Sequence, residues 1–242
     1  MDVQHWRSIL IGKHLDLYRK GVLTKFKSSK FDEDIQKDLP RTYPTQEFFK
    51  YQKKPIENLI RTYCVHHPAM GYFQGLCFLA YPLYYAYYLD NPSTVVHDVY
   101  YSLLEILKVL RPTLPLHQND KNALDTLKKL CRVVEFKLQL KDERLYRSVM
   151  KDNIPLLIMV QAMPCFFANK FSLEDTLLLW DYIFSTCKSS ESLMEKMLDV
   201  FVAMIIYHKY IYLYGSIEEK LLLPSKSENN NAKEIIKIIK LF

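Results

Sequence analysis

The chain has little of what several classes of enzyme and metal protein require. Its 242 residues include only 5 glycines and contain no Gly-x-x-x-x-Gly-Lys-Ser/Thr loop, so the chain is not itself a P-loop nucleotide enzyme. The 5 cysteines are scattered, without a Cys-x-x-Cys pair. This pattern disfavours a disulfide framework or structural zinc and favours reduced thiols. His66 and His67 have no third ligand at metal spacing, and no Ser/His/Asp or Cys/His arrangement rises above chance.

The sequence also lacks a long uninterrupted apolar run and a secretory signal. Its first residues, Met-Asp-Val-Gln-His-Trp, do not follow the basic-then-apolar order of such a signal. The most apolar stretch, residues 76–89, is interrupted by Pro82 and is shorter than the ~20 residues that a spanning helix needs. We therefore expect this stretch to form a buried helix, and we expect a cytoplasmic protein.

A dense basic stripe is missing as well, although the net charge is +6. The lysines are spread over many segments, so nucleic-acid binding is not expected. Attraction to an acidic protein face or to an anionic membrane fits the charge equally well. Residues 233–242 can form a basic amphipathic turn or two, for which docking on the chain's own core is the favoured interpretation. Peripheral association with endomembranes stays open, although so short a helix binds membranes weakly alone.

What is abundant is helical spacing of apolar residues. Hydrophobic residues make up 49% of the chain, and long apolar stretches run between few glycines and 11 prolines. This favours helices over short strands, which would need more turns. The pattern predicts an all-α fold without a convincing strand or internal repeat. Helices are expected over residues 3–11, 15–26, 31–38, 45–66 with a restart at Pro55, 72–89, 95–110, 122–140, 144–150, 155–167 and 193–214, with another capped by Ser172.

Two short segments carry most of the functional information. The first is IQKDLPRTYP, residues 35–44, which holds Arg41 between two prolines. The second is GYFQG, residues 71–75, which holds Gln74 between two glycines ahead of an apolar helix. An exposed arginine on a stiff loop and an exposed glutamine near a helix start could complete the phosphoryl-transfer site of another protein. Taken alone, Arg41 could instead form a surface ion pair with Asp38, and Gln74 could simply bond to backbone.

These segments resemble the TBC domain of Rab GTPase-activating proteins. That family is marked by Ile-x-x-Asp-x-x-Arg followed later by Tyr-x-Gln. The first pattern is filled here by Ile35, Asp38 and Arg41, and the second by Tyr72 and Gln74. Residues 5–10, 59–68 and 167–181 are similar to further blocks of the family, so the resemblance covers roughly residues 6–215. Three short motifs in the right order are more specific than any one alone.

The resemblance implies a single all-α TBC-type domain of roughly a dozen or more helices in two lobes. This domain is expected over residues 1–223. Residues 224–242 are expected to form a polar loop and a short basic amphipathic helix packed on it. The implied function is stimulation of GTP hydrolysis by a Rab-family small GTPase in vesicle trafficking. The chain would need no cofactor of its own, because GTP and Mg²⁺ are carried by the partner, and it would not be a hydrolase by itself.

In this interpretation Arg41 is an arginine finger and Gln74 a glutamine finger, both supplied in trans. A guanidinium is permanently charged and matches phosphate oxygens. The glutamine amide can orient a water and contact phosphate, and the resemblance implies that it replaces the partner's own glutamine. Asp38 is expected to fix the Arg41 loop, and Tyr72 to pack near Gln74. Ile35 and Gly75 complete the supporting set; Gly75 permits close approach of a partner or simply shapes the turn.

One alternative and one departure from the family pattern accompany this interpretation. The alternative is a catalytically silent TBC-like module that recruits a GTPase or an adaptor, although such a scaffold has no need for the Arg/Gln pair. The departure lies early in the family's third motif block, the one that ends with the segment similar to residues 167–181. Many members carry Arg-Trp there, whereas this chain has Gln161-Ala162 followed by Pro164. We expect it to change packing behind the active face or to narrow the choice of partner.

Overall fold

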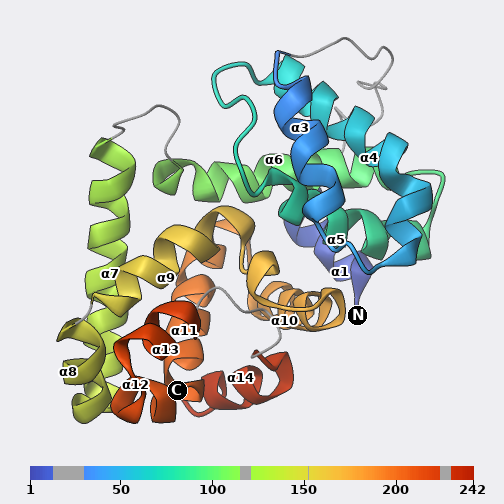
Figure 1. Ribbon diagram of the computed structural model, residues 1–242. Helices are drawn as coiled ribbons and strands as arrows, with labels where there is room; N and C mark the ends of the chain where they lie inside the picture. Colours follow the sequence, from blue (N-terminus) through green and yellow to red (C-terminus); the bar gives the residue numbers. More distant parts are fainter. Residues whose placement is uncertain (13–29, 115–120, 152, 224–229) are drawn as a thin grey trace.

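The fold is entirely helical over the part of the chain that the structure describes. In the computed structural model these are residues 1–12, 30–114, 121–151, 153–223 and 230–242. They form thirteen α-helices joined by short connections and 3₁₀ turns, and they include no strand. The helices gather into two lobes (Figure 1), which confirms the predicted all-α, two-lobed architecture. The helix expected over residues 15–26 lies outside the described residues.

The upper lobe in Figure 1 is built around one buried helix. Its elements are α1 (Val3–Leu10), α3 (Asp32–Asp38), α4 (Glu47–His66), α5 (Leu76–Asp90) and α6 (Val95–Leu110). Helix α5 packs against both α4 and α6, and most of its side chains are buried. The apolar stretch is therefore a core helix, as expected. In the described residues no helix has the length and apolar character needed to cross a membrane.

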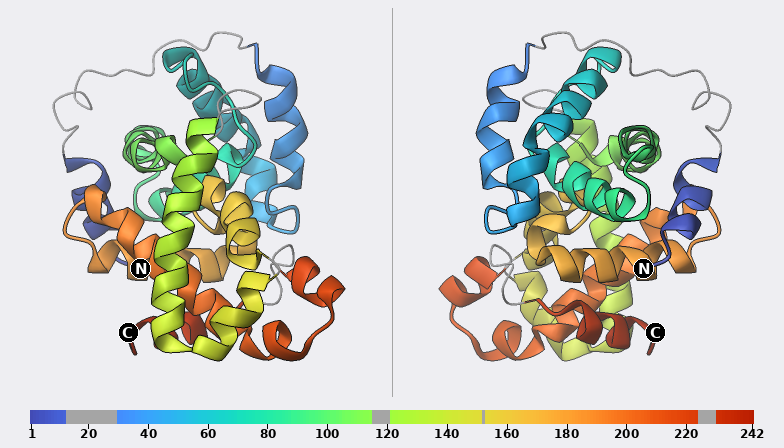
Figure 2. Two further views of the ribbon diagram at one scale, coloured as in Figure 1. Left: turned by 90° about the vertical axis from the view of Figure 1, so that its left-hand side faces the viewer. Right: turned by 90° about the vertical axis from the view of Figure 1, so that its right-hand side faces the viewer.

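The lower lobe holds the remaining helices. They are α7 (Lys121–Lys141), α8 (Glu143–Lys151), α9 (Ile154–Ala162), α10 (Leu173–Thr186), α11 (Leu193–Tyr207), α12 (Lys209–Tyr214), α13 (Ile217–Leu222) and α14 (Ala232–Ile239). Figure 2 (left) shows α7 running lengthwise across the face turned toward the viewer, below helices of the upper lobe. The C-terminal amphipathic helix, α14, packs on α10 and α11, and its Ile235 and Ile239 are buried there.

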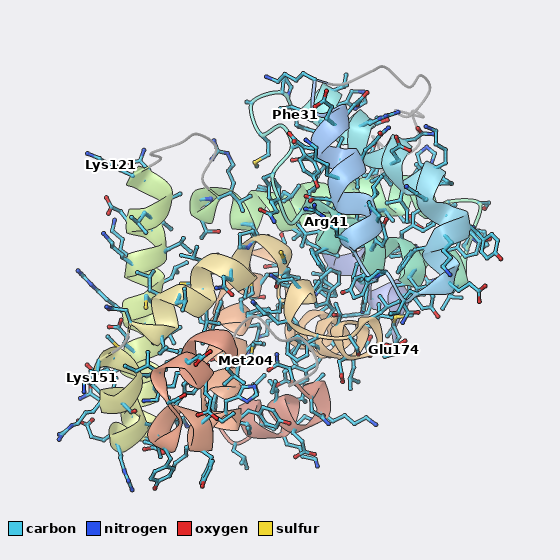
Figure 3. All side chains as sticks on the ribbon, in the orientation of Figure 1. Phe31, Arg41, Lys121, Lys151, Glu174 and Met204 are labelled. Atoms are coloured by element: carbon cyan, nitrogen blue, oxygen red, sulfur yellow. The ribbon has the colours of Figure 1, made fainter. Side chains whose placement is uncertain are left out.

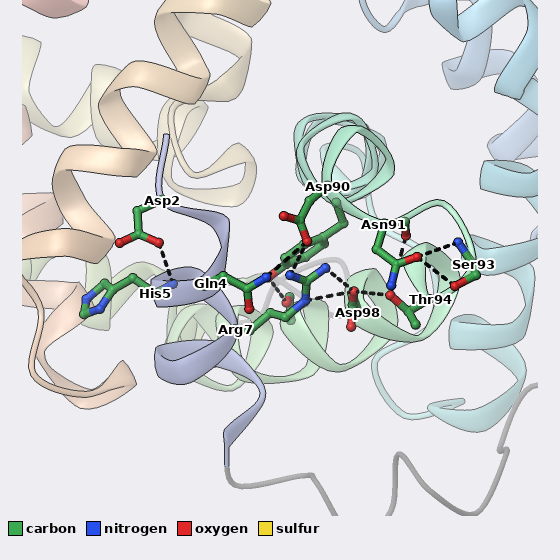
Figure 4. A network of polar contacts seen from close by, with 11 residues as sticks. Asp2, Gln4, His5, Arg7, Asp90, Asn91, Ser93, Thr94 and Asp98 are labelled. Carbon is green, nitrogen blue, oxygen red and sulfur yellow. Dashed lines mark hydrogen bonds and ion pairs between the residues drawn. The ribbon is translucent and has the colours of Figure 1, made fainter.

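The first helix of the chain links the two lobes. Trp6 of α1 is fully buried against Trp180 and Phe184 of α10. Its indole Nε1 donates to Asp181 Oδ1 at 3.1 Å, and the backbone N–H of Asp2 donates to the same oxygen at 2.7 Å. On its other side α1 is bound to α5 and α6 of its own lobe by the guanidinium of Arg7 (Figure 4). Trp180 is thus a core anchor, and Asp181 holds the start of a helix.

Several expected helix boundaries are wrong. Helix α4 begins at Glu47 and runs through Pro55 without a restart, because apolar side chains on both sides of the proline are buried and packing outweighs the local cost. Residues 72–75 form a loop, and α5 starts only at Leu76. Helix α6, by contrast, has the expected bounds, and before it the Asn91 side chain accepts from the backbone N–H of Ser93 at 3.1 Å.

Two long helices predicted in the lower lobe are shorter than the apolar pattern indicates. The helix expected over 155–167 ends at Ala162, because Pro164 forces a 3₁₀ turn. The helix expected over 193–214 is divided at His208 into α11 and α12. By contrast, Ser172 caps α10 as expected, since its hydroxyl accepts from the backbone N–H of Asp175 at 3.1 Å.

Candidate functional site

Arg41 stands on a short, well-held turn. Helix α3 ends at Asp38, and the chain continues through the 3₁₀ turn η2 (Leu39–Arg41), which contains Pro40. The backbone N–H and the hydroxyl of Thr42 both donate to the Asp38 carbonyl, at 3.2 and 3.0 Å. The hydroxyl of Tyr81 donates to the Leu39 carbonyl at 3.0 Å. The backbone is thereby fixed while the Arg41 side chain stays exposed, at the end of α3 nearest the lower lobe (Figure 3).

The turn after Arg41 is anchored in the other lobe through Tyr43. This residue has a positive φ of 48°, which is uncommon for a residue other than glycine. Its buried hydroxyl donates to the Ala168 carbonyl at 2.9 Å and lies 3.1 Å from Thr176 Oγ1. Burial raises the pKa of Tyr43 far above its usual value, so the phenol stays protonated and remains a donor.

Gln74 lies on a second loop, shaped by glycines. Gly71 has a φ of 60°, and a Cβ there would lie 2.4 Å from the Phe31 ring at the start of α3. Gly75 has a φ of 122° and forms the N-cap of α5. Glycine suits both conformations, and at Gly75 the φ lies where residues with a side chain are rarely found. Between them the side chain of Gln74 is exposed.

A hydrogen bond joins the two loops. The Tyr72 hydroxyl donates to Asp38 Oδ2 at 2.6 Å. Burial, the neighbouring Cys77 and this hydrogen bond all raise the pKa of Tyr72, so the phenol keeps its proton. In the described residues no ion pair joins Asp38 to Arg41. The Asp38 carboxylate thus accepts a hydrogen bond from Tyr72, and its backbone carbonyl accepts the hydrogen bonds that fix the turn carrying Arg41.

These loops frame a groove of about 330 Å³. Its lining residues are Asp34, Lys37, Asp38, Arg41, Tyr72, Phe73 and Gln74. Four of the residues predicted from the sequence, Asp38, Arg41, Tyr72 and Gln74, are therefore brought together. The groove offers a permanent cation and a neutral amide to whatever enters it. Such a pair can contact phosphate oxygens and hold a water.

The other predicted residues lie behind the groove. Ile35 is fully buried in the core, and Gly75 is buried beneath the Gln74 loop. Sequence reasoning missed Asp34, Lys37 and Phe73. A signal for two of them existed, because positions 34, 37, 38 and 41 follow the spacing of a single helix face. Phe73 gives no such signal, since it lies in an irregular loop.

The described residues offer no metal centre. Within them no group of three or more His, Cys, Asp and Glu side chains could hold a metal ion. His66 and His67 instead bond to one hydroxyl, that of Tyr100, at 2.8 and 3.2 Å. Burial, together with the neighbouring His66, lowers the pKa of His67. The pair therefore stabilises the end of α4 against α6.

Comparison with known families identifies the fold. The family model of the Rab-GTPase-TBC domain matches residues 14–212, most of the chain. The chain belongs to this family. Among solved structures, the Ypt/Rab-GAP domain of Gyp1p is similar with a TM-score of 0.71 at 16% identity, over 95% of this chain and 78% of that one. A flagellar RabGAP TBC domain from Chlamydomonas has a TM-score of 0.60 at 15% identity, over 94% and 73%.

Curated relatives match the TBC domain at lower coverage of their own length. The Rab GTPase-activating protein eat-17 of Caenorhabditis elegans is 34% identical over 36% of this chain and 10% of its own. TBC1 domain family member 5 of Homo sapiens is 21% identical over 75% and 28%. Growth hormone-regulated TBC protein 1-A of Danio rerio is 24% identical over 69% and 46%. This chain therefore spans less than half the length of each of these relatives.

Gln161 and Pro164, two of the positions expected to depart from the family pattern, lie beside Gln74. A second pocket of about 330 Å³ adjoins the groove, and Gln74, Gln161, Pro164 and Lys170 are among its lining residues. The Lys170 ammonium donates to Gln161 Oε1 at 2.9 Å. Burial lowers the pKa of Lys170 to about 8. Gln161 and Pro164 therefore lie directly behind the groove, and their effect on packing or on the choice of partner stays a prediction.

Proposed function

We propose that this TBC domain accelerates GTP hydrolysis by a Rab-family small GTPase, with Arg41 and Gln74 acting in trans. The observation that carries the proposal is that both side chains are exposed at one groove. They come from separate loops that the Asp38–Tyr72 hydrogen bond joins. A packing role would bury such groups, and a bare scaffold would not need them.

Each side chain has a distinct role in this proposal. Arg41 stabilises the charge that develops on the transferred phosphoryl group, which a guanidinium supplied in trans can do with an effect of about 10³–10⁵ on rate. Gln74 orients the attacking water through its carbonyl and contacts phosphate through its amide. GTP and Mg²⁺ belong to the partner. The turn at Pro40 limits the freedom that Arg41 loses on insertion.

Single-turnover phosphate release from a panel of GTP-loaded Rab GTPases tests this function. We expect at least one GTPase to be stimulated by the wild-type chain. Arg41→Ala should then lower the stimulated rate by about 10³ or more. Gln74→Ala should lower it by about 10²–10³, as loss of one transition-state contact does. Both variants should keep the melting temperature of the wild type, because both side chains are exposed.

Matched controls separate the fingers from general surface effects. Arg132→Ala and Gln139→Ala change exposed residues of the same types on α7, and both should keep full activity. Full stimulation by Arg41→Ala or Gln74→Ala would refute the assigned roles. Binding of a GTPase without any acceleration by the wild type would instead favour the silent recruiting module.

A further inference from the structure

The segment that carries Arg41 (residues 39–43) and the segment that carries Gln74 (residues 71–75), here called the two finger loops, touch one short segment of the lower lobe. We call residues 163–168 the finger bracket; it comprises the 3₁₀ turn η4 (Met163–Cys165), Phe166, Phe167 and Ala168. Phe166 and Phe167 have positive φ values of 47° and 66°, which residues with a side chain rarely adopt. Such strain persists only where the surroundings determine the conformation, and it often occurs at functional sites.

The surroundings of the finger bracket hold it firmly. Trp180 Nε1 donates to the Phe166 carbonyl at 2.9 Å. The Phe166 ring packs against Trp180 and Phe184, and the Phe167 ring packs edge-on against Phe201 of α11 at 4.7 Å between centroids. Both phenylalanines are buried. The bracket is therefore a fixed reference point for whatever rests on it.

The arginine loop rests on one end of the finger bracket. Tyr43, two residues after Arg41, donates its hydroxyl to the Ala168 carbonyl. The same hydroxyl lies within hydrogen-bond distance of Thr176 on α10. The other bonds that hold this turn, from Thr42 and Tyr81, come from the upper lobe. Among these bonds, those of Tyr43 are the ones that place Arg41 relative to the lower lobe.

The glutamine loop rests on the other end. A Cβ at Gly75 would lie 3.0 Å from Cys165 Sγ and 3.3 Å from the Pro164 carbonyl oxygen. The backbone directly after Gln74 is thus in close contact with the turn that Pro164 creates. The contact is a packing contact, because burial raises the pKa of the Cys165 thiol to about 12 and keeps it neutral.

We propose that the finger bracket positions the two fingers separately, Arg41 through Tyr43–Ala168 and Gln74 through Gly75–Cys165. This inference rests on the proposed function, in which Arg41 and Gln74 must contact the partner's nucleotide at the same time. Displacement of a reacting group by about 1 Å can cost about 10²-fold in rate. Tyr43, Pro164 and Cys165 are therefore positioning residues that never touch the nucleotide.

Two variants address the two contacts individually. Tyr43→Phe removes the hydroxyl from the Ala168 contact without changing the ring. Cys165→Val adds bulk where Gly75 already leaves no room. With a stimulated GTPase, each should lower the saturating single-turnover rate by about 10-fold or more, while the half-saturating concentration of the chain stays within about twofold.

Combination with the finger variants separates positioning from general damage. In a Gln74→Ala background, Cys165→Val should have no further effect, because the group it displaces is already gone. Tyr43→Phe should still reduce the residual rate in that background. Cys187→Val and Tyr87→Phe, at a buried thiol and a buried tyrosine outside the bracket, should leave the rate unchanged.

Crystal structures of the two variants give a readout that does not depend on any GTPase. Cys165→Val should move Gln74 while Arg41 keeps its place, and Tyr43→Phe should do the reverse. Unmoved loops in both variants would overturn the inference, even if no GTPase were stimulated. It would also be overturned by a further loss from Cys165→Val in the Gln74→Ala background that equals its loss in the wild type. Absence of stimulation by the wild type counts only against the proposed function.

Discussion

Within the upper lobe, Tyr72 joins the loop that carries Gln74 to the turn that carries Arg41. Its hydroxyl is 2.6 Å from Asp38 Oδ2, and it keeps its proton because burial and the nearby Cys77 and Asp38 raise its pKa. A short hydrogen bond to a carboxylate is among the stronger kinds in proteins. The Tyr-x-Gln motif therefore supplies the glutamine itself and also the Tyr72–Asp38 hydrogen bond, which we call the strut between the two loops.

We expect Tyr72→Phe to loosen this strut without unfolding the chain. The half-buried Asp38 carboxylate loses a donor, which should lower the free energy of unfolding by about 1–3 kcal/mol. The stimulated hydrolysis rate should fall by about 10-fold, since the loops are no longer held together. Urea denaturation and single-turnover assays check the two effects. Tyr88→Phe, at another half-buried tyrosine, is the control, and an equal loss of activity there would argue against the strut.

Lys170 gives a prediction that depends on pH. Burial lowers its pKa to about 8 in the folded chain, below the ordinary value near 10.5. Between these values the unfolded state binds more protons than the folded state, so stability should rise with pH. Relative to Lys170→Met, the free energy of unfolding of the wild type should increase by about 1.5 kcal/mol from pH 8 to 9.5. Denaturation at both pH values measures this, and a constant difference would contradict the lowered pKa.

At the scale of single residues, the sequence predicts the exposed side chains of the groove better than the residues that hold them in place. Arg41 and Gln74 could be predicted because short motifs surround them. Tyr43 could not, because its partner Ala168 is 125 positions away and nothing local marks the contact. Asp38 was predicted to fix the Arg41 loop, and its backbone carbonyl does accept from Thr42 in that turn. That the Asp38 side chain accepts a hydrogen bond from the Tyr72 hydroxyl could be learned only from the folded structure.

The helices show where periodicity succeeds and where packing overrides it. The spacing of apolar residues indicated most helices within a few residues. It could not show that α4 continues through Pro55, because burial on both sides outweighs the local cost of the proline. It also could not separate α11 from α12, since apolar residues continue through the break at His208.

Helix α1 is the element whose attachment can be tested most cleanly. Arg7 Nε and Nη2 donate to Asp98 Oδ2 on α6 at 3.0 and 2.8 Å, and Nη1 bonds to Asp90 at the end of α5 (Figure 4). The Asp98 side chain is only 3% exposed. Removal of the arginine would leave this carboxylate buried with Thr94 as its remaining side-chain donor in the described residues.

We therefore expect Arg7→Met to lower the free energy of unfolding by about 3 kcal/mol, the usual effect of breaking a buried pair from one side. Addition of Asp98→Asn to this variant should recover part of the loss, because the unpaired charge is then gone. Urea denaturation of the two variants and the wild type measures both effects. A loss below about 0.5 kcal/mol for Arg7→Met would show that the network contributes little.

At the scale of the whole molecule, the two lobes meet behind the groove that holds Arg41 and Gln74. Helix α1 links the lobes through Trp6 and Arg7, and the finger bracket reaches from the lower lobe to both finger loops. The position of Arg41 and Gln74 is thus a property of the assembled fold and not of either motif. The resemblance in sequence predicted this two-lobed architecture, and the structure confirms it (Figure 1).

The central claim is that this chain lends a cation and an amide to a nucleotide that another protein holds. The most direct test uses a stimulated GTPase whose own catalytic glutamine has been replaced by alanine. We expect the wild-type chain still to accelerate phosphate release from this GTPase by about 10²-fold or more, and Gln74→Ala to give no acceleration. Failure of the wild-type chain, or equal acceleration by Gln74→Ala, would contradict the account.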